Sequence, residues 1–193
     1  MIRVAKDAWN SAALAADVLR QGKLAVLPTD TMYGFSAVDT EEGAARICAA
    51  KDRPEEKAFI RLIADPGGLS RFACIPVPAG LLRLWPGALT LIVPVSGGKT
   101  MAFRCPGDAW LRQVVAETGR PVFSTSVNVS GDPPMRRAEE IAAKFGNMLD
   151  LLVISDPEET AEILPSTLLD ISVRPWRILR QGAVRIPDGL LNS

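Results

Sequence analysis

The stretch LAVLPTDTMYG (Leu24–Gly34) joins a buried strand to a polar turn. The continuous apolar run Leu24–Leu27 ends at Pro28, and its length and composition are typical of a strand that is buried on both faces. Hydroxyl groups and a carboxylate follow at once in Thr29–Thr31, and Met32–Val38 then returns to an extended pattern. Since α/β proteins place their ligands at the ends of strands, this turn is a candidate binding site. A local turn, in which Asp30 bonds to nearby backbone, explains the same residues.

Helical and strand-like segments alternate on both sides of this stretch. Asn10 or Ser11 can begin a helix that ends near Gly22, and Thr40 can cap an acidic-first helix that reaches Lys51. No repeat, linker or low-complexity segment divides the chain. We therefore expect one α/β domain over residues 1–193, with a twisted mixed parallel and antiparallel sheet and flanking helices. The predicted strands are 24–27, 32–38, 59–63, 89–95, 101–104, 121–124, 151–154, 167–171 and 177–179, and the later helices are 81–85, 108–118 and 137–145.

Composition excludes several classes of chemistry. The 193 residues include 22 basic and 22 acidic side chains, no histidine, and 48% hydrophobic residues. Zero net charge argues against a protein held to nucleic acid or membrane by bulk electrostatics. Without histidine, the chain cannot form a Ser-His or Cys-His nucleophile pair, and it lacks the commonest zinc ligand. Catalysis here must therefore use Lys, Arg, Ser, Thr, Asp, Glu or backbone groups.

The cysteines and the apolar runs indicate a reduced cytoplasmic protein. Cys48, Cys74 and Cys105 form no CxxC pair, so neither a zinc knuckle nor a disulfide framework is predicted. Each is better explained as a small buried residue than as a nucleophile. The N-terminus does not have the pattern of a secretory signal, and no uncharged apolar run is long enough to span a membrane.

Three further polar clusters follow predicted strands or helices. A solvated helix end is the usual explanation for Lys51-Asp52-Arg53-Pro54, with Lys57 shortly after. Pro54, however, fixes the exit of the chain and would hold Lys51 and Arg53 in the defined relation that a phosphate or carboxylate site needs. Arg104 ends a β-like run, where an edge-strand surface charge is the alternative. The richest cluster is STSVNVSG (Ser124–Gly131), which is either a Ser/Thr-rich turn or a loop that lines an anion.

Together these clusters indicate a small anionic ligand such as a nucleotide. No GxxxxGK[ST] or GxGxxG pattern occurs, so neither a P-loop nor a Rossmann site is predicted. No carboxylate cluster suggests a dedicated metal site. Several cations and many hydroxyls favour catalysis by positioning and electrostatics.

In order along the chain, the clusters resemble the YrdC-like family of threonylcarbamoyl-AMP synthases. The resemblance covers nearly the whole chain and is closest to the short bacterial form, because no second domain follows Gly189. The stretches that carry it are LPTDTMYGF (Leu27–Phe35), AAKDRPEEKAFIRLIAD (Ala49–Asp65), WPGALTLIVP (Trp85–Pro94), MAFRCP (Met101–Pro106), STSVNVSGDPP (Ser124–Pro134) and LRQGAV (Leu179–Val184).

The resemblance implies a YrdC-like fold and an ATP-dependent nucleotidyltransferase. Such an enzyme makes threonylcarbamoyl-AMP and pyrophosphate from L-threonine, bicarbonate and ATP. A partner transferase complex then moves the threonylcarbamoyl group to adenosine at position 37 of tRNA. Mg²⁺ is expected to be bound mainly through the ATP phosphates.

The resemblance also assigns roles to residues. The family's functional tetrad matches Lys51, Arg53, Ser126 and Asn128, which are the expected catalytic residues. Arg104 would form the fork for the threonine carboxylate, whereas Trp85 and Pro86 are expected to pack in the core. The implied ATP contacts are Arg53, Lys57, Thr100, Ser126, Asn128 and Arg180, and the implied threonine contacts are Thr31, Tyr33, Arg104, Ser124 and Ser166.

The chain departs from the family pattern in places. Many members have proline where Ala58 and Ala88 stand and histidine where Leu62 stands. Longer members have a serine near Pro134, which affects one ATP contact. The region from Leu151 to Pro175 matches least.

Three alternatives compete with the synthase. The chain could be a double-stranded RNA or tRNA-binding module, a non-catalytic paralogue, or the related domain of hydrogenase-maturation carbamoyltransferases. The paralogue is disfavoured because all members of the tetrad are retained. The carbamoyltransferases are much longer chains that carry acylphosphatase and zinc-binding segments, both absent here. The RNA-binding alternative needs these cations to converge in one cleft: Lys51, Arg53, Lys57, Arg61, Arg104, Arg136 and Arg137.

Overall fold

A single mixed sheet organises the part of the chain that the computed structural model describes, residues 1–52, 59–155 and 164–191. Its strand order is β1-β8-β2-β3-β7-β4-β6-β5-β9-β10. Both parallel pairs, such as β4 with β6, and antiparallel pairs, such as β3 with β7, occur, so the predicted mixed α/β fold is confirmed. The strands are β1 (Ile2–Ala5), β2 (Ala25–Leu27), β3 (Gly34–Val38), β4 (Ile60–Leu62), β5 (Leu89–Val95), β6 (Lys99–Arg104), β7 (Val122–Ser126), β8 (Leu151–Ile154), β9 (Thr167–Asp170) and β10 (Arg177–Arg180).

Two helices begin at side-chain caps that the sequence predicts, whereas the Asn10 side chain, before the first helix, makes no capping hydrogen bond. The Thr40 hydroxyl accepts a hydrogen bond from the backbone N–H of Gly43 at 3.1 Å, and the Asp108 carboxylate accepts one from Leu111 at 3.2 Å. These caps confirm two of the predicted helix starts. The helices are α1 (Ser11–Arg20), α2 (Glu41–Lys51), α3 (Ala79–Leu82), α4 (Ala109–Thr118), α5 (Ala138–Phe145) and α6 (Asp188–Leu191), with short 3₁₀ turns η1 (Pro66–Arg71) and η2 (Ser96–Gly98).

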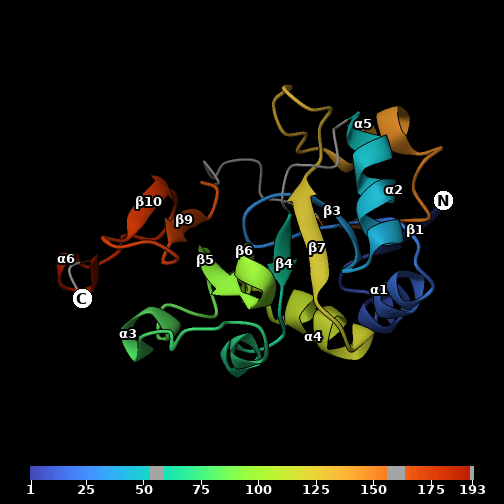
Figure 1. Ribbon diagram of the computed structural model, residues 1–193. Coiled ribbons are helices and arrows are strands. Elements are labelled where there is room, and N and C mark those ends of the chain that lie inside the picture. Colours follow the sequence, from blue (N-terminus) through green and yellow to red (C-terminus); the bar gives the residue numbers. More distant parts are fainter. Residues whose placement is uncertain (53–58, 156–163, 192–193) are drawn as a thin grey trace.

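Helices cover both faces of the sheet on the side that carries the N-terminus (Figure 1). Helices α1 and α4 bury Leu19 and Leu111 against Leu27 and its neighbours on one face. On the other face, α2 and α5 bury side chains against Phe35, whose ring meets that of Phe145 edge-on at 5.0 Å. Each large apolar side chain that is fully buried contributes roughly 1.5–3 kcal/mol to stability.

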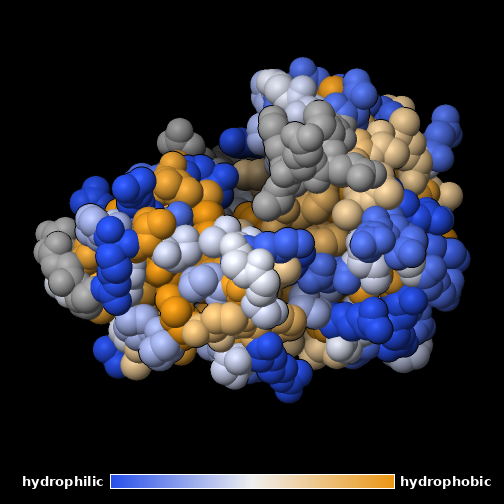
Figure 2. Space-filling model, in the orientation of Figure 1, coloured by the Kyte–Doolittle hydropathy of each residue, from blue (hydrophilic) through white to orange (hydrophobic). Residues whose placement is uncertain are grey.

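A separate apolar cluster lies at the other end of the sheet. There Leu81 of α3 packs with Leu91 of β5 and Leu169 of β9. Trp85 belongs to this cluster, and its indole N–H donates to the Leu89 carbonyl at 2.7 Å, so the expectation that Trp85 packs in the core is confirmed. Pro86, in contrast, is exposed, and the expectation that it would pack in the core is wrong. In the space-filling view, the outline is indented between this end and the part with α2 and α5 (Figure 2).

Some elements differ from the sequence-based expectation. The edge strand β1 and the turn η1 were not predicted, because β1 is short and largely exposed and therefore lacks an apolar run. Strand β7 extends to Ser126 because antiparallel pairing with β3 continues to Gly34. Cys48 and Cys105 are buried as predicted, whereas Cys74 is exposed, which corrects that prediction. Among the described residues, no helix combines the length and apolar character needed to cross a membrane.

Candidate functional site

The register of the central strands brings several predicted site residues to one face of the sheet. Ile60 of β4 is paired on one side with Ala102 of β6 and on the other with Ser124 of β7. Residues two apart along a strand point to the same face, so this face continues along β6 and β7 in both directions. The predicted site residues that share it are Thr100, Arg104, Ser124 and Ser126.

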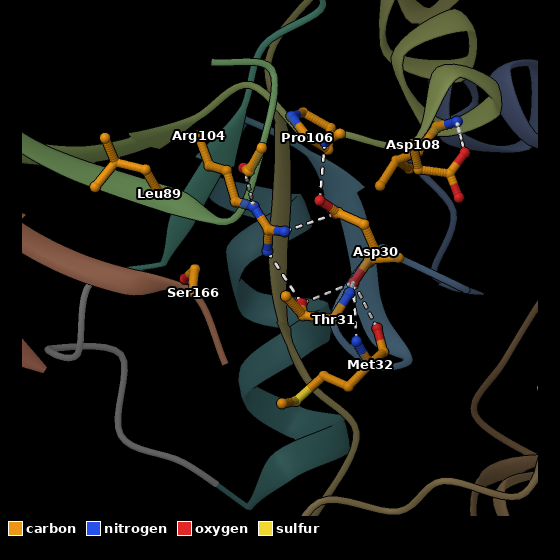
Figure 3. Close-up of polar contacts among 12 residues, drawn as sticks. Asp30, Thr31, Met32, Leu89, Arg104, Pro106, Asp108 and Ser166 are labelled. Carbon is orange, nitrogen blue, oxygen red and sulfur yellow. Dashed lines mark hydrogen bonds and ion pairs between the residues drawn. The ribbon is translucent and has the colours of Figure 1, made fainter. Parts of the chain in front are cut away.

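Arg104 is the most heavily engaged side chain on this face (Figure 3). Its Nε donates to the Gly87 carbonyl at 3.1 Å, Nη1 donates to Thr31 Oγ1 at 3.0 Å, and Nη2 donates to Asp30 Oδ1 at 2.6 Å. The side chain is only 6% exposed. Burial lowers the pKa of Arg104, while the neighbouring Asp30 carboxylate acts in the opposite direction. An arginine keeps its charge even so, and two of its five N–H groups have no acceptor among the described residues.

The turn between β2 and β3 fixes the position of the Thr31 hydroxyl. Thr29 Oγ1 donates its proton to the Met32 carbonyl at 2.7 Å. Thr29 Oγ1 also accepts from the backbone N–H groups of Thr31 and Met32, each at 3.1 Å, and it lies 3.0 Å from Thr31 Oγ1. Because Thr31 Oγ1 accepts from Arg104, one lone pair remains, and Thr31 offers a hydrogen-bond acceptor to a ligand.

A second arginine reaches the same region from the edge strand β10. Arg180 donates from Nε to the Ser166 carbonyl at 3.0 Å and from Nη2 to Ser166 Oγ at 3.1 Å, and Ser166 Oγ lies 2.8 Å from Thr90 Oγ1. Burial lowers the pKa of Arg180, and the positive charge of Arg104 lowers it further. Arg180 forms no ion pair within the described residues. The Arg104–Arg180 region thus contains two cations, with Asp30 bonded to only one of them.

Lys51, Ser126 and Asn128 form one hydrogen-bonded cluster at the end of β7, which we call the Lys51 cluster. The Lys51 ammonium is almost fully buried and donates to the Ser126 carbonyl at 2.5 Å, to the Asn128 carbonyl at 3.1 Å and to Asn128 Oδ1 at 2.8 Å. Ser126 Oγ donates to the same Oδ1 at 2.6 Å. The Asn128 amide donates at 2.8 Å to the carbonyls of both Val129 and Asp132. All side-chain hydrogen-bonding positions of Asn128 are therefore used inside the protein.

Gly34 joins the Lys51 cluster to the turn that carries Thr31. It is paired with Ser126 in the β3–β7 ladder. A Cβ atom at this position would lie 2.7 Å from Ser124 Oγ and 3.7 Å from Thr29 Cγ2. Only glycine allows these side chains to approach the strand so closely. Sequence reasoning quoted this glycine within its motif and assigned it no function.

The remaining predicted site residues have different surroundings. Tyr33 is buried in the core cluster beneath α2 and α5, with its hydroxyl donating to the Ser155 carbonyl at 2.9 Å, and not beside Thr31. Thr100 is exposed near the start of β6. Arg53 and Lys57 lie outside the described residues. Asp30 was expected to bond to nearby backbone, whereas its partners are Arg104 and the distant Gly107.

Within the described part of the chain, no group of three or more Cys, Asp or Glu side chains could hold a metal ion. The donors that meet at the Arg104–Arg180 region are guanidinium and hydroxyl groups, which suit anions. This side-chain chemistry fits a ligand that carries carboxylate or phosphate groups.

Comparison with known proteins agrees with this chemistry. The family model of the Sua5/YciO/YrdC proteins, described as telomere recombination, matches residues 17–182. Over 188 residues, the chain is 34% identical to the threonylcarbamoyl-AMP synthase of Pyrococcus abyssi, covering 91% of this chain and 55% of that protein. It is 28% identical over 183 residues to the protein of the same name from Vibrio cholerae, covering 87% of this chain and 95% of that protein. The chain thus spans about half the length of the Pyrococcus relative and 53% of a relative with the same name from Bacillus subtilis.

Solved structures show the same relationship. The crystal structure of P. abyssi Sua5 complexed with L-threonine superimposes with a TM-score of 0.81 at 32% sequence identity, covering 94% of this chain and 57% of that chain. Escherichia coli YciO, at 22% identity, superimposes with a TM-score of 0.79 over 94% of this chain and 93% of that chain, which shows the shared fold.

Proposed function

The chain belongs to the Sua5/YciO/YrdC family, and we propose that it is an L-threonylcarbamoyladenylate synthase. It would convert L-threonine, bicarbonate and ATP to threonylcarbamoyl-AMP and pyrophosphate, as the shared name of its curated relatives suggests. Its place among enzymes would be that of a nucleotidyltransferase.

One structural observation carries this proposal: the Arg104 guanidinium is nearly buried, is held by Gly87, Thr31 and Asp30, and keeps two N–H groups that have no acceptor among the described residues. The charge of Arg104 also lowers the pKa of Arg180, so an anion that binds near both arginines would relieve their mutual repulsion. Thr31, an acceptor beside Arg104, suits the amino or hydroxyl group of an amino acid whose carboxylate binds the guanidinium. The complex of the Pyrococcus relative with L-threonine is consistent with a threonine site in this fold.

The reaction needs positioning and charge neutralisation more than a nucleophile from the protein. The neutral amine of threonine attacks the carbon of bicarbonate, and water leaves to give a carbamate. A carbamate oxygen then attacks the α-phosphorus of ATP, the bond from that phosphorus to the bridging oxygen breaks, and pyrophosphate leaves. Carbamate and triphosphate are both anionic, so cations must bring them together. No histidine is required, which agrees with the composition.

We assign the two substrates to adjacent parts of the face. Threonine would lie between Thr31, Arg104 and Ser124, whose hydroxyl has no hydrogen-bond partner within the described residues. Ser166 would act indirectly, because its hydroxyl lies between Thr90 and Arg180 and the residue is 2% exposed. The assigned ATP contacts are Arg53, Lys57, Thr100, Ser126 and Arg180, and Lys51 and Asn128 would shape the loop that receives the nucleotide.

The proposal includes further partners. Mg²⁺ would enter with the ATP phosphates and retain several waters. The product would pass to a threonylcarbamoyl transferase complex that modifies tRNA, and the enzyme would work in the cytoplasm, where ATP and tRNA are present. We assign no residue to contact with the transferase or with tRNA.

Direct RNA binding through converging cations has less support. Arg61 is adjacent to Leu62 in β4 and points to the face opposite Arg104, where it pairs with Asp39 at 2.7 Å. Arg137 pairs with Glu140 at 3.5 Å, and Lys51 is buried in its cluster. These side chains do not form one basic surface with Arg104.

Pyrophosphate release tests the proposal. Purified protein with ATP and Mg²⁺ is assayed with threonine, with bicarbonate, with both and with neither. The synthase should release pyrophosphate only when both are added. Release without threonine, or no release from folded protein that binds tRNA with a steep salt dependence, would favour a different function.

A further inference from the structure

The Asp30 carboxylate connects two segments that are far apart in sequence. Its Oδ1 accepts a hydrogen bond from Arg104 Nη2 at 2.6 Å, and its Oδ2 accepts one from the backbone N–H of Gly107 at 2.9 Å (Figure 3). Asp30 lies in the turn between β2 and β3, whereas Gly107 lies between β6 and α4. One side chain thus fixes the turn that carries Thr31 to the strand that carries Arg104.

The backbone around Asp30 is shaped to allow this connection. A Cβ atom at Gly107 would lie 3.0 Å from Asp30 Oδ2 and 3.6 Å from the Cα of Gly87. A larger residue would push the carboxylate away. Gly87 in turn accepts from Arg104 Nε, and its own N–H donates to the Cys105 carbonyl at 2.9 Å. Two separate segments, the turn with Asp30 and Thr31 and the loop with Gly87, therefore hold the guanidinium in one orientation.

The hydrogen bonds leave Arg104 with a defined capacity for ligand. A guanidinium has five N–H groups. Three of them have acceptors on Gly87, Thr31 and Asp30, so one N–H on Nη1 and one on Nη2 remain within the described residues. The direction of both remaining N–H groups depends on the orientation of the guanidinium, and Asp30 is the one charged acceptor among the three that fix this orientation.

We propose that Asp30 is a positioning residue for substrate recognition: its carboxylate holds Arg104 so that the two remaining N–H groups and the Thr31 acceptor face the same amino-acid substrate. This inference rests on the proposed function and adds a residue to it. Asp30 acts through Arg104 and Thr31 and makes no contact with the reacting atoms. It also leaves the pair close to neutral, so that Arg180 supplies the unbalanced charge of the site.

A matched ion pair on the other face separates positioning from stability. Arg61 and Asp39 are joined at 2.7 Å, with side chains 15% and 22% exposed, compared with 2.6 Å and 6% and 20% for Arg104 and Asp30. Asp30→Asn and Asp39→Asn each remove one carboxylate charge from a similar pair. Both should lower the thermal unfolding temperature to a similar extent. Only Asp30→Asn should change the binding of threonine.

The experiment measures threonine binding by calorimetry and the KM values for threonine and ATP with wild type and both variants. We expect Asp30→Asn to raise the Kd and the KM for threonine at least tenfold and to change the KM for ATP less than twofold. Asp39→Asn should bind both substrates as the wild type does. Unchanged or tighter threonine binding in Asp30→Asn would overturn the inference, and tighter binding would mean that Asp30 competes with the substrate.

A second variant covers the case in which Asp30→Asn does not fold. Asp30→Glu keeps the charge but displaces it by one methylene, so this variant should fold. It should still weaken the binding of threonine more than the binding of ATP. Wild-type affinity in Asp30→Glu would also overturn the inference. Failure of the wild type to bind threonine would instead remove the proposed function, and this inference with it, so the two failures are distinguishable.

Discussion

The Lys51 ammonium lies 2.8 Å from Oδ1 of Asn128, 77 residues further along the chain. This contact links the last residue of α2 to the turn after β7. The backbone reinforces the link, since the N–H of Ser130 donates to the Lys51 carbonyl at 2.8 Å. Lys51 therefore places a positive charge at the turn and also holds the turn in shape.

Replacement of Lys51 by alanine should abolish measurable threonylcarbamoyl-AMP formation while the protein remains folded. The change removes the donor to the carbonyls of Ser126 and Asn128 and leaves Asn128 Oδ1 with Ser126 Oγ as its remaining donor. The lost hydrogen bonds should cost about 1–3 kcal/mol of stability. Pyrophosphate release and thermal unfolding measure both effects. Lys144→Ala is the control, because Lys144 reaches the same turn through Asp132 at 3.4 Å but is exposed. Near-normal turnover by Lys51→Ala would show that the Lys51 cluster is not needed for the reaction.

Arg104→Lys should weaken the binding of threonine more than the binding of ATP. Lysine keeps the charge but cannot donate to Gly87, Thr31 and Asp30 while also presenting two N–H groups to a carboxylate. The KM for threonine should rise at least tenfold and the KM for ATP less than threefold in steady-state assays. Arg61→Lys, on the opposite face, should behave like wild type. Equal increases in the KM values for threonine and ATP would show that Arg104 does not bind threonine selectively, and would contradict our assignment.

Gly34→Ala should impair activity through a side chain that it displaces. The new methyl group would lie 2.7 Å from Ser124 Oγ, inside normal contact distance. Loss of the Ser124 hydroxyl in Ser124→Ala removes that clash, so the double variant should be more stable than Gly34→Ala alone. Thermal unfolding of both single variants and the double variant measures this coupling. Additive losses of stability would contradict the close approach.

Much of the fold follows from local sequence patterns. The apolar run that forms β2, the Thr40 and Asp108 caps and the stop at Gly119 all depend on neighbouring residues, and each was predicted correctly. The missed strand β1 is stabilised by parallel pairing with β8, which is about 150 residues away and leaves no local pattern. Strand pairing over such distances depends on tertiary structure and could not be predicted from the sequence.

The site was predictable in its residue types and not in its connections. The hydroxyl-rich turns and Arg104 were visible as polar groups at strand ends. The partner of Asp30 was not, because nothing local shows that residue 30 meets residues 104 and 107. Tyr33 is a different case: it shares the buried core with Phe35 and Ala37, an alternation that the sequence itself contains. The tetrad assignment came from family resemblance, and its roles remain predictions.

The cysteines should differ sharply in reactivity. Burial raises the pKa of the Cys105 thiol to about 11, and its Sγ lies 3.7 Å from the Ala64 carbonyl. Cys74 is exposed and Cys48 is buried. Alkylation of native protein near pH 8, followed by mass spectrometry, should modify Cys74 first. Modification of Cys105 at a comparable rate would contradict its burial.

The same thiol predicts a pH dependence of stability. Its pKa in the folded protein, about 11, lies above the ordinary value of 9.0, so the folded state binds more protons between these values. The free energy of unfolding should therefore fall as the pH rises from about 9 to about 11. Cys105→Ala should show a shallower fall than wild type in urea unfolding over this range. Parallel curves would show that other groups cause the decline.

The most direct test of the central claim is the mass of the nucleotide product formed from ATP and threonine with ¹³C-labelled bicarbonate. The account predicts threonylcarbamoyl-AMP whose mass shifts by the single label, because the carbonyl carbon comes from bicarbonate. A product without the label, such as AMP or a threonyl adenylate, would contradict the proposed synthase.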